Sequence, residues 1–106
     1  MSKSYNYDEV IEFCKAGGPI DNSLAQLQED LKNLRLITEQ CQELFHGEGA
    51  SGIYSAYDTI FKNIGYANSG SSVGAWGVAA NIRTINSSVY YNALRDKEAD
   101  EQGEIQ

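Results

Sequence analysis

The stretch Leu44-Phe45-His46-Gly47-Glu48-Gly49-Ala50-Ser51-Gly52 lies near the middle of the chain and separates two long segments with helical periodicity. Its three glycines leave the backbone free to adopt positive φ angles, which helix ends and tight reversals require. One apolar stripe ends at Phe45 and the next begins at Ile53. The stretch therefore predicts the turn of a helical hairpin at residues 45–52, with Phe45 packed beneath the turn.

Before this turn, apolar residues recur at steps of three and four, which is the pattern of one face of an α-helix. The opposite face is polar. We predict a helix over Leu24–Leu44, opened by a capping box at residues 23–26. The apolar face, expected to pack inside the hairpin, comprises Leu24, Leu27, Leu31, Leu34, Ile37, Cys41 and Leu44. A shorter helix is predicted over Asp8–Ala16, and Gly17-Gly18-Pro19 should end it, because proline disfavours helical geometry in the residue before it.

After the turn, the same spacing continues from Ile53 to Ile64 and resumes beyond the glycine-rich segment 65–74. Two interpretations compete for this segment. A loop at residues 68–72 would give two helices and a small bundle, as the glycine content favours. One continuous, locally weakened helix is favoured by the unbroken phase, and we expect it. Its small residues would then let a partner helix approach closely; they are Ala67, Ser71, Gly74 and Ala75.

The predicted fold class is all-α: a helical hairpin of two long antiparallel helices, the second one open to interruption, completed by a partner chain. Residues 1–95 should form a single domain. The charged segment 96–106 has no apolar period and is expected to be a disordered tail.

The composition favours a soluble domain, since 42% of the residues are hydrophobic and 22% are charged. The net charge of −7 argues against nucleic acid as a partner, because phosphate binding needs clustered Lys and Arg. No apolar run approaches the ~18 residues that suggest a membrane span, so no membrane insertion is expected. The N-terminus does not resemble a signal peptide. We expect a cytoplasmic protein, with any export by a signal-peptide-independent route.

No catalytic, cofactor-binding or metal-binding constellation is found. His46 is the only histidine and has no Cys or His at a metal-ligand spacing. The Gly47-x-Gly49-x-x-Gly52 pattern follows a helix rather than a strand, so dinucleotide binding is not predicted. Cys14 and Cys41 are expected to be free thiols. The chain is therefore predicted not to be an enzyme.

Aromatic residues crowd the second half, and some fall outside the stripe led by Ile53 and Ile60. They either widen the apolar face within the hairpin or form a second face that meets another protein. A two-helix hairpin has little interior, so such hairpins usually need a partner to bury both sides. The predicted partner-binding residues are Tyr54, Phe61, Ala67, Ser71, Ala75 and Trp76.

In length, helix arrangement and central turn, the chain resembles the WxG family of small type VII secretion proteins over roughly residues 20–95. In that family the turn carries Trp-x-Gly; here Phe45-His46-Gly47 occupies the corresponding place, followed by Gly49 and Ala50. Phenylalanine replaces the tryptophan, and the family's Tyr-x-x-x-Asp/Glu export signal is missing, because the fourth residue after Tyr91 is Arg95.

The resemblance implies a non-catalytic helical binding protein of a type VII secretion system, acting as partner or targeting factor for a secreted effector. Its partner would be an LXG-type effector, a second small helical protein or, in a homodimer, a second copy. The alternative is an acidic immunity protein or phage-encoded inhibitor that blocks a basic site on its target.

Overall fold

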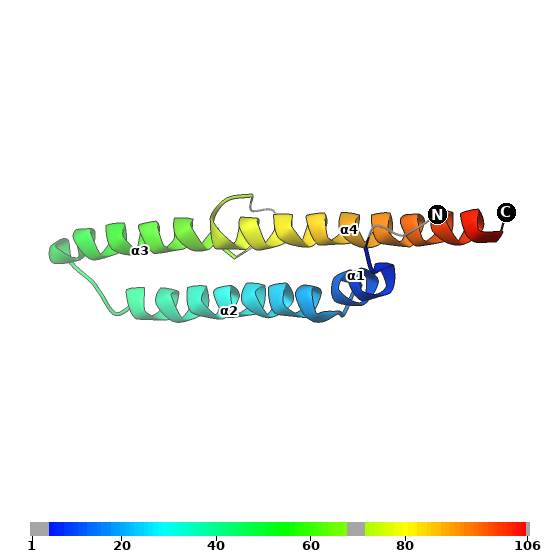
Figure 1. Cartoon of the computed structure of the whole chain (residues 1–106). Helices are drawn as coiled ribbons and strands as arrows, with labels where there is room; N and C mark the ends of the chain where they lie inside the picture. Colours follow the sequence, from blue (N-terminus) through cyan, green and yellow to red (C-terminus); the bar gives the residue numbers. More distant parts are fainter. Residues whose placement is uncertain (1–4, 68–71, 106) are drawn as a thin grey trace. The chain divides into compact units, whose positions relative to one another are not determined.

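The computed structural model describes residues 5–67 and 72–105, whose regular structure is entirely helical (Figure 1). This confirms the all-α class. The elements are α1 Tyr7–Cys14, α2 Pro19–Gln42, the short 3₁₀ helix η1 Glu48–Ala50, α3 Ser51–Ile64 and α4 Gly74–Ile105.

Contacts within the chain group its residues into two compact units. Unit 1 combines the N-terminal part, up to Leu24, with the C-terminal part from Ile82 onward. Unit 2 comprises Ala25–Asn81. The single domain predicted over residues 1–95 stays a prediction.

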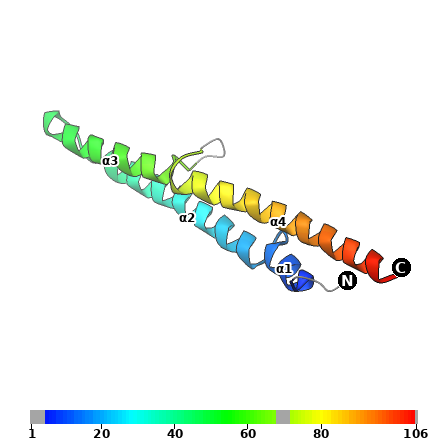
Figure 2. The same ribbon diagram turned by 45° about the horizontal axis from the view of Figure 1, so that its top comes forward.

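Unit 2 is a helical hairpin. The C-terminal part of α2 ends at Gln42, the chain reverses through residues 43–50, and α3 returns antiparallel beside α2 (Figures 1 and 2). The predicted reversal is therefore found, although α2 stops two residues before Leu44. A hydrogen bond closes the turn: the Tyr54 hydroxyl on α3 donates to the Phe45 carbonyl.

The second half of the hairpin is interrupted, so the expected continuous helix is wrong. Gly65 adopts the left-handed conformation, with a φ of 82°, and its N–H donates to the Phe61 carbonyl at 2.9 Å, which closes α3. Tyr66 and Ala67 also have positive φ angles, 56° and 47°, and cannot continue a right-handed helix. The helix resumes at Gly74, and residues 68–71 lie outside the described part of the chain.

In unit 1, α1 begins after Asn6, whose side-chain oxygen accepts the Glu9 N–H at 3.1 Å. Gly17 has a φ of 77°, which only glycine adopts readily, and this reverses the chain between α1 and α2. Helix α2 begins at Pro19 rather than at the predicted capping box. Proline suits a first helical position, because its ring presets φ and it has no N–H left to satisfy.

The segment predicted to be a disordered tail is helical through Ile105, so that prediction is wrong for residues 96–105. Contacts with the N-terminal part of unit 1 explain the difference. The Tyr5 hydroxyl donates to the Asp96 carboxylate at 2.6 Å, and Lys97 Nζ lies 2.7 Å from Asp8 Oδ1. These pairs join residues about ninety positions apart, which local sequence patterns cannot reveal.

Candidate functional site

The predicted turn motif lies at the end of the unit 2 hairpin. Phe45 was predicted to pack beneath the turn, but it is exposed, so that prediction is wrong. His46 is exposed as well, and Gly47 has a φ of 89°, the left-handed conformation that the reversal requires. The Ala50 N–H donates to the Gly47 carbonyl at 3.1 Å, and Ala50 is buried at the start of α3, while Gly49 is exposed. The motif thus builds the reversal rather than a chemical centre.

A cavity of about 480 Å³ opens beside this turn, lined by residues from the end of α2, the turn and α3. We call it the turn pocket; it is lined by Glu39, Gln42, Glu43, His46, Tyr54 and Phe61. Two of these side chains are carboxylates and two are aromatic. The predicted partner-binding residues Tyr54 and Phe61 therefore come together here, with Tyr54 exposed and Phe61 buried.

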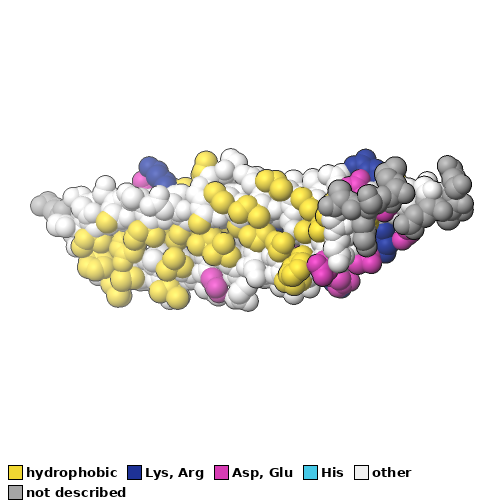
Figure 3. All heavy atoms as spheres, in the orientation of Figure 1, with side chains coloured by type: hydrophobic (Ala, Val, Ile, Leu, Met, Phe, Trp, Pro, Cys, Tyr) yellow, Lys and Arg dark blue, Asp and Glu magenta, His cyan; other side chains and the backbone are white. Residues whose placement is uncertain are grey.

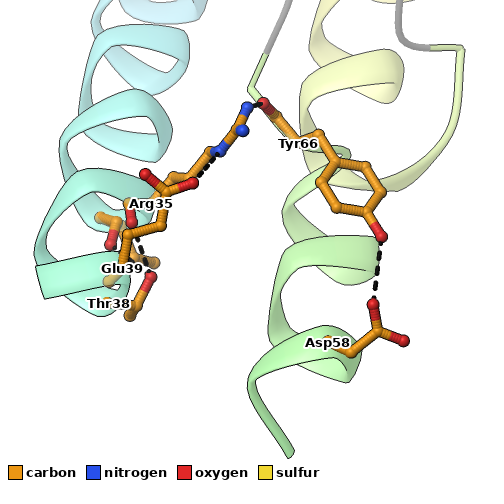
Figure 4. A network of polar contacts seen from close by, with 6 residues as sticks. Arg35, Thr38, Glu39, Asp58 and Tyr66 are labelled. Carbon is orange, nitrogen blue, oxygen red and sulfur yellow. Dashed lines mark hydrogen bonds and ion pairs between the residues drawn. The ribbon is translucent and has the colours of Figure 1, made fainter. Parts of the chain in front are cut away.

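A polar network braces one wall of the turn pocket (Figure 4). Arg35 on α2 pairs with Glu39 at 2.9 Å and donates to the Tyr66 carbonyl. The Tyr66 hydroxyl in turn donates to Asp58 at 3.3 Å. Asp58 also pairs with Lys62 at 2.9 Å; the ammonium lowers the pKa of Asp58, and the carboxylate raises the pKa of Lys62. Glu39 is thus held in place by contacts that span α2 and the end of α3.

Among the small residues predicted to admit a partner helix, Gly74 serves the chain's own packing. A Cβ atom on Gly74 would lie 2.5 Å from the Gly65 nitrogen and 2.6 Å from the Asn63 carbonyl. A Cβ atom on Gly77 would meet the Ser72 backbone at 2.4 Å. Gly74 therefore lets the start of α4 lie close to the end of α3, whereas Gly77 leaves room for the Ser72 backbone just before α4.

The remaining predicted partner-binding residues are less informative. Ala67, Ala75 and Trp76 are partly buried, and the Trp76 indole nitrogen is buried without a hydrogen-bond partner. Ser71 lies outside the described residues. Of the six predicted contacts, only Tyr54 offers an exposed aromatic ring.

The apolar face of α2 is the feature whose role differs most from the prediction. Leu24 and Leu31 are partly buried, but the rest of the predicted packing face is exposed. Ile37 exposes 62% of its surface and Leu44 exposes 75%. We call the exposed residues the α2 stripe: Leu27, Leu34, Ile37, Cys41 and Leu44.

The side of α2 that packs within the hairpin is polar. Gln28 is buried, and Arg35, Glu39 and Gln42 are partly buried. At about 100° per residue, these side chains lie roughly a third of a turn around the helix from the α2 stripe. Tyr57 also reaches α2, where its hydrogen bond with the Cys41 thiol raises the pKa of Tyr57. Figure 3 shows hydrophobic side chains gathered along α2 on the face toward the viewer.

In unit 1, α4 also has a polar side that contacts the N-terminal part of the unit and apolar side chains that are exposed. Asn86 is buried and donates to the Cys14 carbonyl at 3.0 Å, and Arg83 pairs with Asp21 at 3.0 Å. These contacts border a cavity of about 320 Å³, in which Cys14 and Ser87 also take part. The apolar side chains of this part of α4 are exposed instead: Ile82, Ile85 and Val89.

Chemical centres of other kinds are not found in the part of the chain that the structure describes. Within residues 5–67 and 72–105, no three His, Cys, Asp or Glu side chains are grouped so that they could hold a metal ion. No described helix combines the length and the apolar character needed to cross a membrane. Cys14 is buried, Cys41 is exposed, and both are free thiols, as predicted.

Comparisons of the chain with protein-family models, with curated proteins and with solved structures found no match. The exposed apolar stripe and the turn pocket must therefore be interpreted from their own geometry. The sequence identified the residues that share the α2 stripe, but it predicted that they pack inside the hairpin, whereas they are exposed. The turn pocket was not predicted, because it joins α2 residues to α3 residues across the turn.

Proposed function

We propose that this chain is a non-catalytic helical binding protein that docks another protein on the α2 stripe. The exposure of the stripe carries the proposal. Four exposed apolar side chains on one face of α2 (Leu27, Leu34, Ile37 and Cys41), followed by exposed Leu44 in the turn, are typical of a protein–protein interface.

The size of the stripe sets a minimum for the interface. Covering five half-exposed apolar side chains gains roughly 1 kcal/mol each, or about 5 kcal/mol in all. Association itself costs about 4–15 kcal/mol. A stable complex therefore needs more apolar contact than the stripe alone. Unit 2 offers further exposed side chains for it: Ile60, Val73 and Val78.

The finer proposal concerns the partner. The helix–turn–helix arrangement around Phe45-His46-Gly47 supports the resemblance to WxG proteins of type VII secretion systems. We accordingly assign the chain the role of partner or targeting factor for a secreted effector. The helical N-terminal domain of an LXG-type toxin is the first candidate to test.

An acidic inhibitor is less well supported. Such a protein needs a surface whose charge is mostly negative, whereas several acidic side chains here form ion pairs with basic side chains of the same chain. Asp21 pairs with Arg83, and Asp8 pairs with Lys97, in each case within unit 1. The apolar stripe has no role in that alternative.

The test compares two charged substitutions on α2. Ile37→Asp places a carboxylate in the stripe, where burial by a partner would leave it unpaired at a cost of several kcal/mol. Leu36→Asp is the matched control, because Leu36 is 48% exposed and lies on another face of α2. Both variants should retain the helical circular dichroism of the wild type, since neither side chain is buried.

Binding to the purified toxin domain is measured by isothermal titration calorimetry. We expect Ile37→Asp to weaken binding about 100-fold or more and Leu36→Asp to leave it nearly unchanged. Equal affinities for the two folded variants would refute docking on the α2 stripe. Failure of the wild type to bind any toxin domain would refute the type VII assignment alone.

A further inference from the structure

We infer that the turn pocket binds a cationic side chain, an arginine supplied by the docked protein. The inference rests on the proposed function for the origin of the arginine. The site itself rests on three observations in unit 2: its charge, its aromatic walls and its free carboxylate.

The end of α2 carries two carboxylates, of which Arg35 pairs with only one, Glu39. The C-terminal end of a helix carries partial negative charge, so natural helices favour Lys, Arg or His there. The last turn of α2 contains no basic residue, and Glu39 and Glu43 lie at this end instead. Two carboxylates beside a helix C-terminus raise the local negative potential and favour a bound cation.

The two carboxylates differ in their availability. Glu39 is engaged, because its Oε1 atom accepts Arg35 Nε at 2.9 Å. Glu43 forms no side-chain hydrogen bond or ion pair within residues 5–67 and 72–105. Its carboxylate lines the cavity and can accept two parallel N–H bonds from a guanidinium group.

Aromatic rings also line the turn pocket. Tyr54 and Phe61 both line the turn pocket, and the Tyr54 hydroxyl is anchored on the Phe45 carbonyl. A cation over an aromatic face gains about 0.5–1 kcal/mol at exposed sites. The planar guanidinium of arginine stacks on such a ring and pairs with a carboxylate at the same time, whereas the lysine ammonium is a compact point charge. The cavity of about 480 Å³ is open to a side chain arriving from outside.

The experiment uses the full chain and two small probes, N-acetylarginine amide and N-acetylcitrulline amide. Citrulline has nearly the shape of arginine without the charge. His46 is the only histidine and lines the pocket, so its imidazole ring signals in a proton NMR spectrum report binding without ambiguity. We expect a saturable change with the arginine probe and at least a fivefold weaker response, about 1 kcal/mol, with citrulline.

Four substitutions, in two matched pairs, test whether arginine binds in the turn pocket. Glu43→Gln keeps the shape of the side chain and should weaken arginine binding about fivefold. Glu29→Gln removes an exposed α2 carboxylate that does not line the pocket, and it should leave binding unchanged. Tyr54→Leu should weaken binding, whereas Tyr54→Phe, which retains the ring, should preserve most of it.

Equal responses to arginine and citrulline would overturn the inference, and so would equal losses from Glu43→Gln and Glu29→Gln. This result is independent of the docking test. Arginine binding can fail while Ile37→Asp still abolishes the complex, in which case only the turn pocket is wrongly assigned. Arginine binding can also hold when no toxin domain binds, in which case only the proposed partner is wrong.

Discussion

The hydrogen bond from Asn86 to the Cys14 carbonyl gives the sharpest test of unit 1. It is 3.0 Å long, both residues are buried, and it satisfies a backbone carbonyl at the end of α1. Asn86→Ala removes the donor and leaves that carbonyl buried without its partner. Losing a net hydrogen bond and stranding a buried acceptor destabilises a fold by about 1–3 kcal/mol.

Taking about 2 kcal/mol, the melting temperature should fall by about 10 °C, since 1 kcal/mol corresponds to roughly 4–8 °C in a domain of this size. Thermal unfolding is followed by circular dichroism at 222 nm. Ser88→Ala serves as the control, because Ser88 is exposed two positions along the same helix. Equal melting temperatures for the two variants would falsify the buried-bond argument.

Asn86→Asp sharpens the test through pH. A carboxylate cannot donate to the Cys14 carbonyl, but a protonated carboxyl group can. The introduced group should therefore titrate with a raised pKa. The stability gap between this variant and the wild type should be wide at pH 7 and should narrow as the pH falls toward 4. A gap that is independent of pH would contradict donation to that carbonyl.

Three further predictions concern other parts of the chain. Gly74→Ala should destabilise unit 2 by about 2–4 kcal/mol in urea unfolding, because Gly74 has a φ of 68° and the added Cβ would strike backbone atoms. Gly103→Ala is the control, because a Cβ at Gly103 would meet nothing within 4 Å. It should be neutral or stabilising by up to about 1 kcal/mol. Ellman's reagent should modify Cys41 quickly and Cys14 slowly in the folded protein, and two equally fast thiols would contradict the burial of Cys14. Hydrogen bonds from the Gly17 N–H and, second, from Arg83 lower the pKa of Asp21 in the folded chain. The ionised Asp21 carboxylate therefore stabilises the fold above about pH 4, and this stabilisation is lost as the pH falls through the lowered pKa. Asp21→Asn should make the stability measured by urea unfolding fall less steeply at acidic pH.

The sequence was most informative where local rules decide the structure. The three-four spacing before Leu44 predicted the course of α2, and the glycines after Phe45 predicted the reversal. Gly17-Gly18-Pro19 correctly separated α1 from α2. In each case, a residue's own backbone preference or its nearest helical neighbours determine the outcome.

Two errors arose where spacing was given more weight than backbone preference or distant contacts. The apolar phase is kept across residues 65–74, but Gly65 takes the left-handed conformation and ends α3 regardless of that phase. The charged segment 96–105 was predicted to be disordered for want of an apolar period. Its Glu, Lys and Ala residues are good helix formers, and that signal could have corrected the prediction. The contacts of Asp96 and Lys97 with Tyr5 and Asp8 could not be foreseen from local patterns.

The error about the apolar face of α2 bears on function. Periodicity identifies which side chains share a face, but it does not say whether that face meets the same chain or another one. In unit 2, α3 packs its buried Phe61 and Ile64 in the hairpin, while the facing side of α2 carries Arg35 and Gln42. A hairpin of two helices buries only one face of each, so the second apolar face of α2 stays exposed, and the proposed partner would cover it.

This division of contacts has a thermodynamic consequence that links fold to binding. Among the described residues, no large side chain is fully buried, so the free chain is held by hydrogen bonds, ion pairs and modest apolar contacts. Such contacts fix geometry, but each contributes only about 0.5–1.5 kcal/mol. A partner that covers the α2 stripe supplies the burial that the free chain lacks. Because the partner binds only the folded chain, a free partner concentration of 100 times Kd stabilises the fold by about 2.7 kcal/mol. If the proposed partner binds the α2 stripe, folding and recognition should therefore be coupled through that surface.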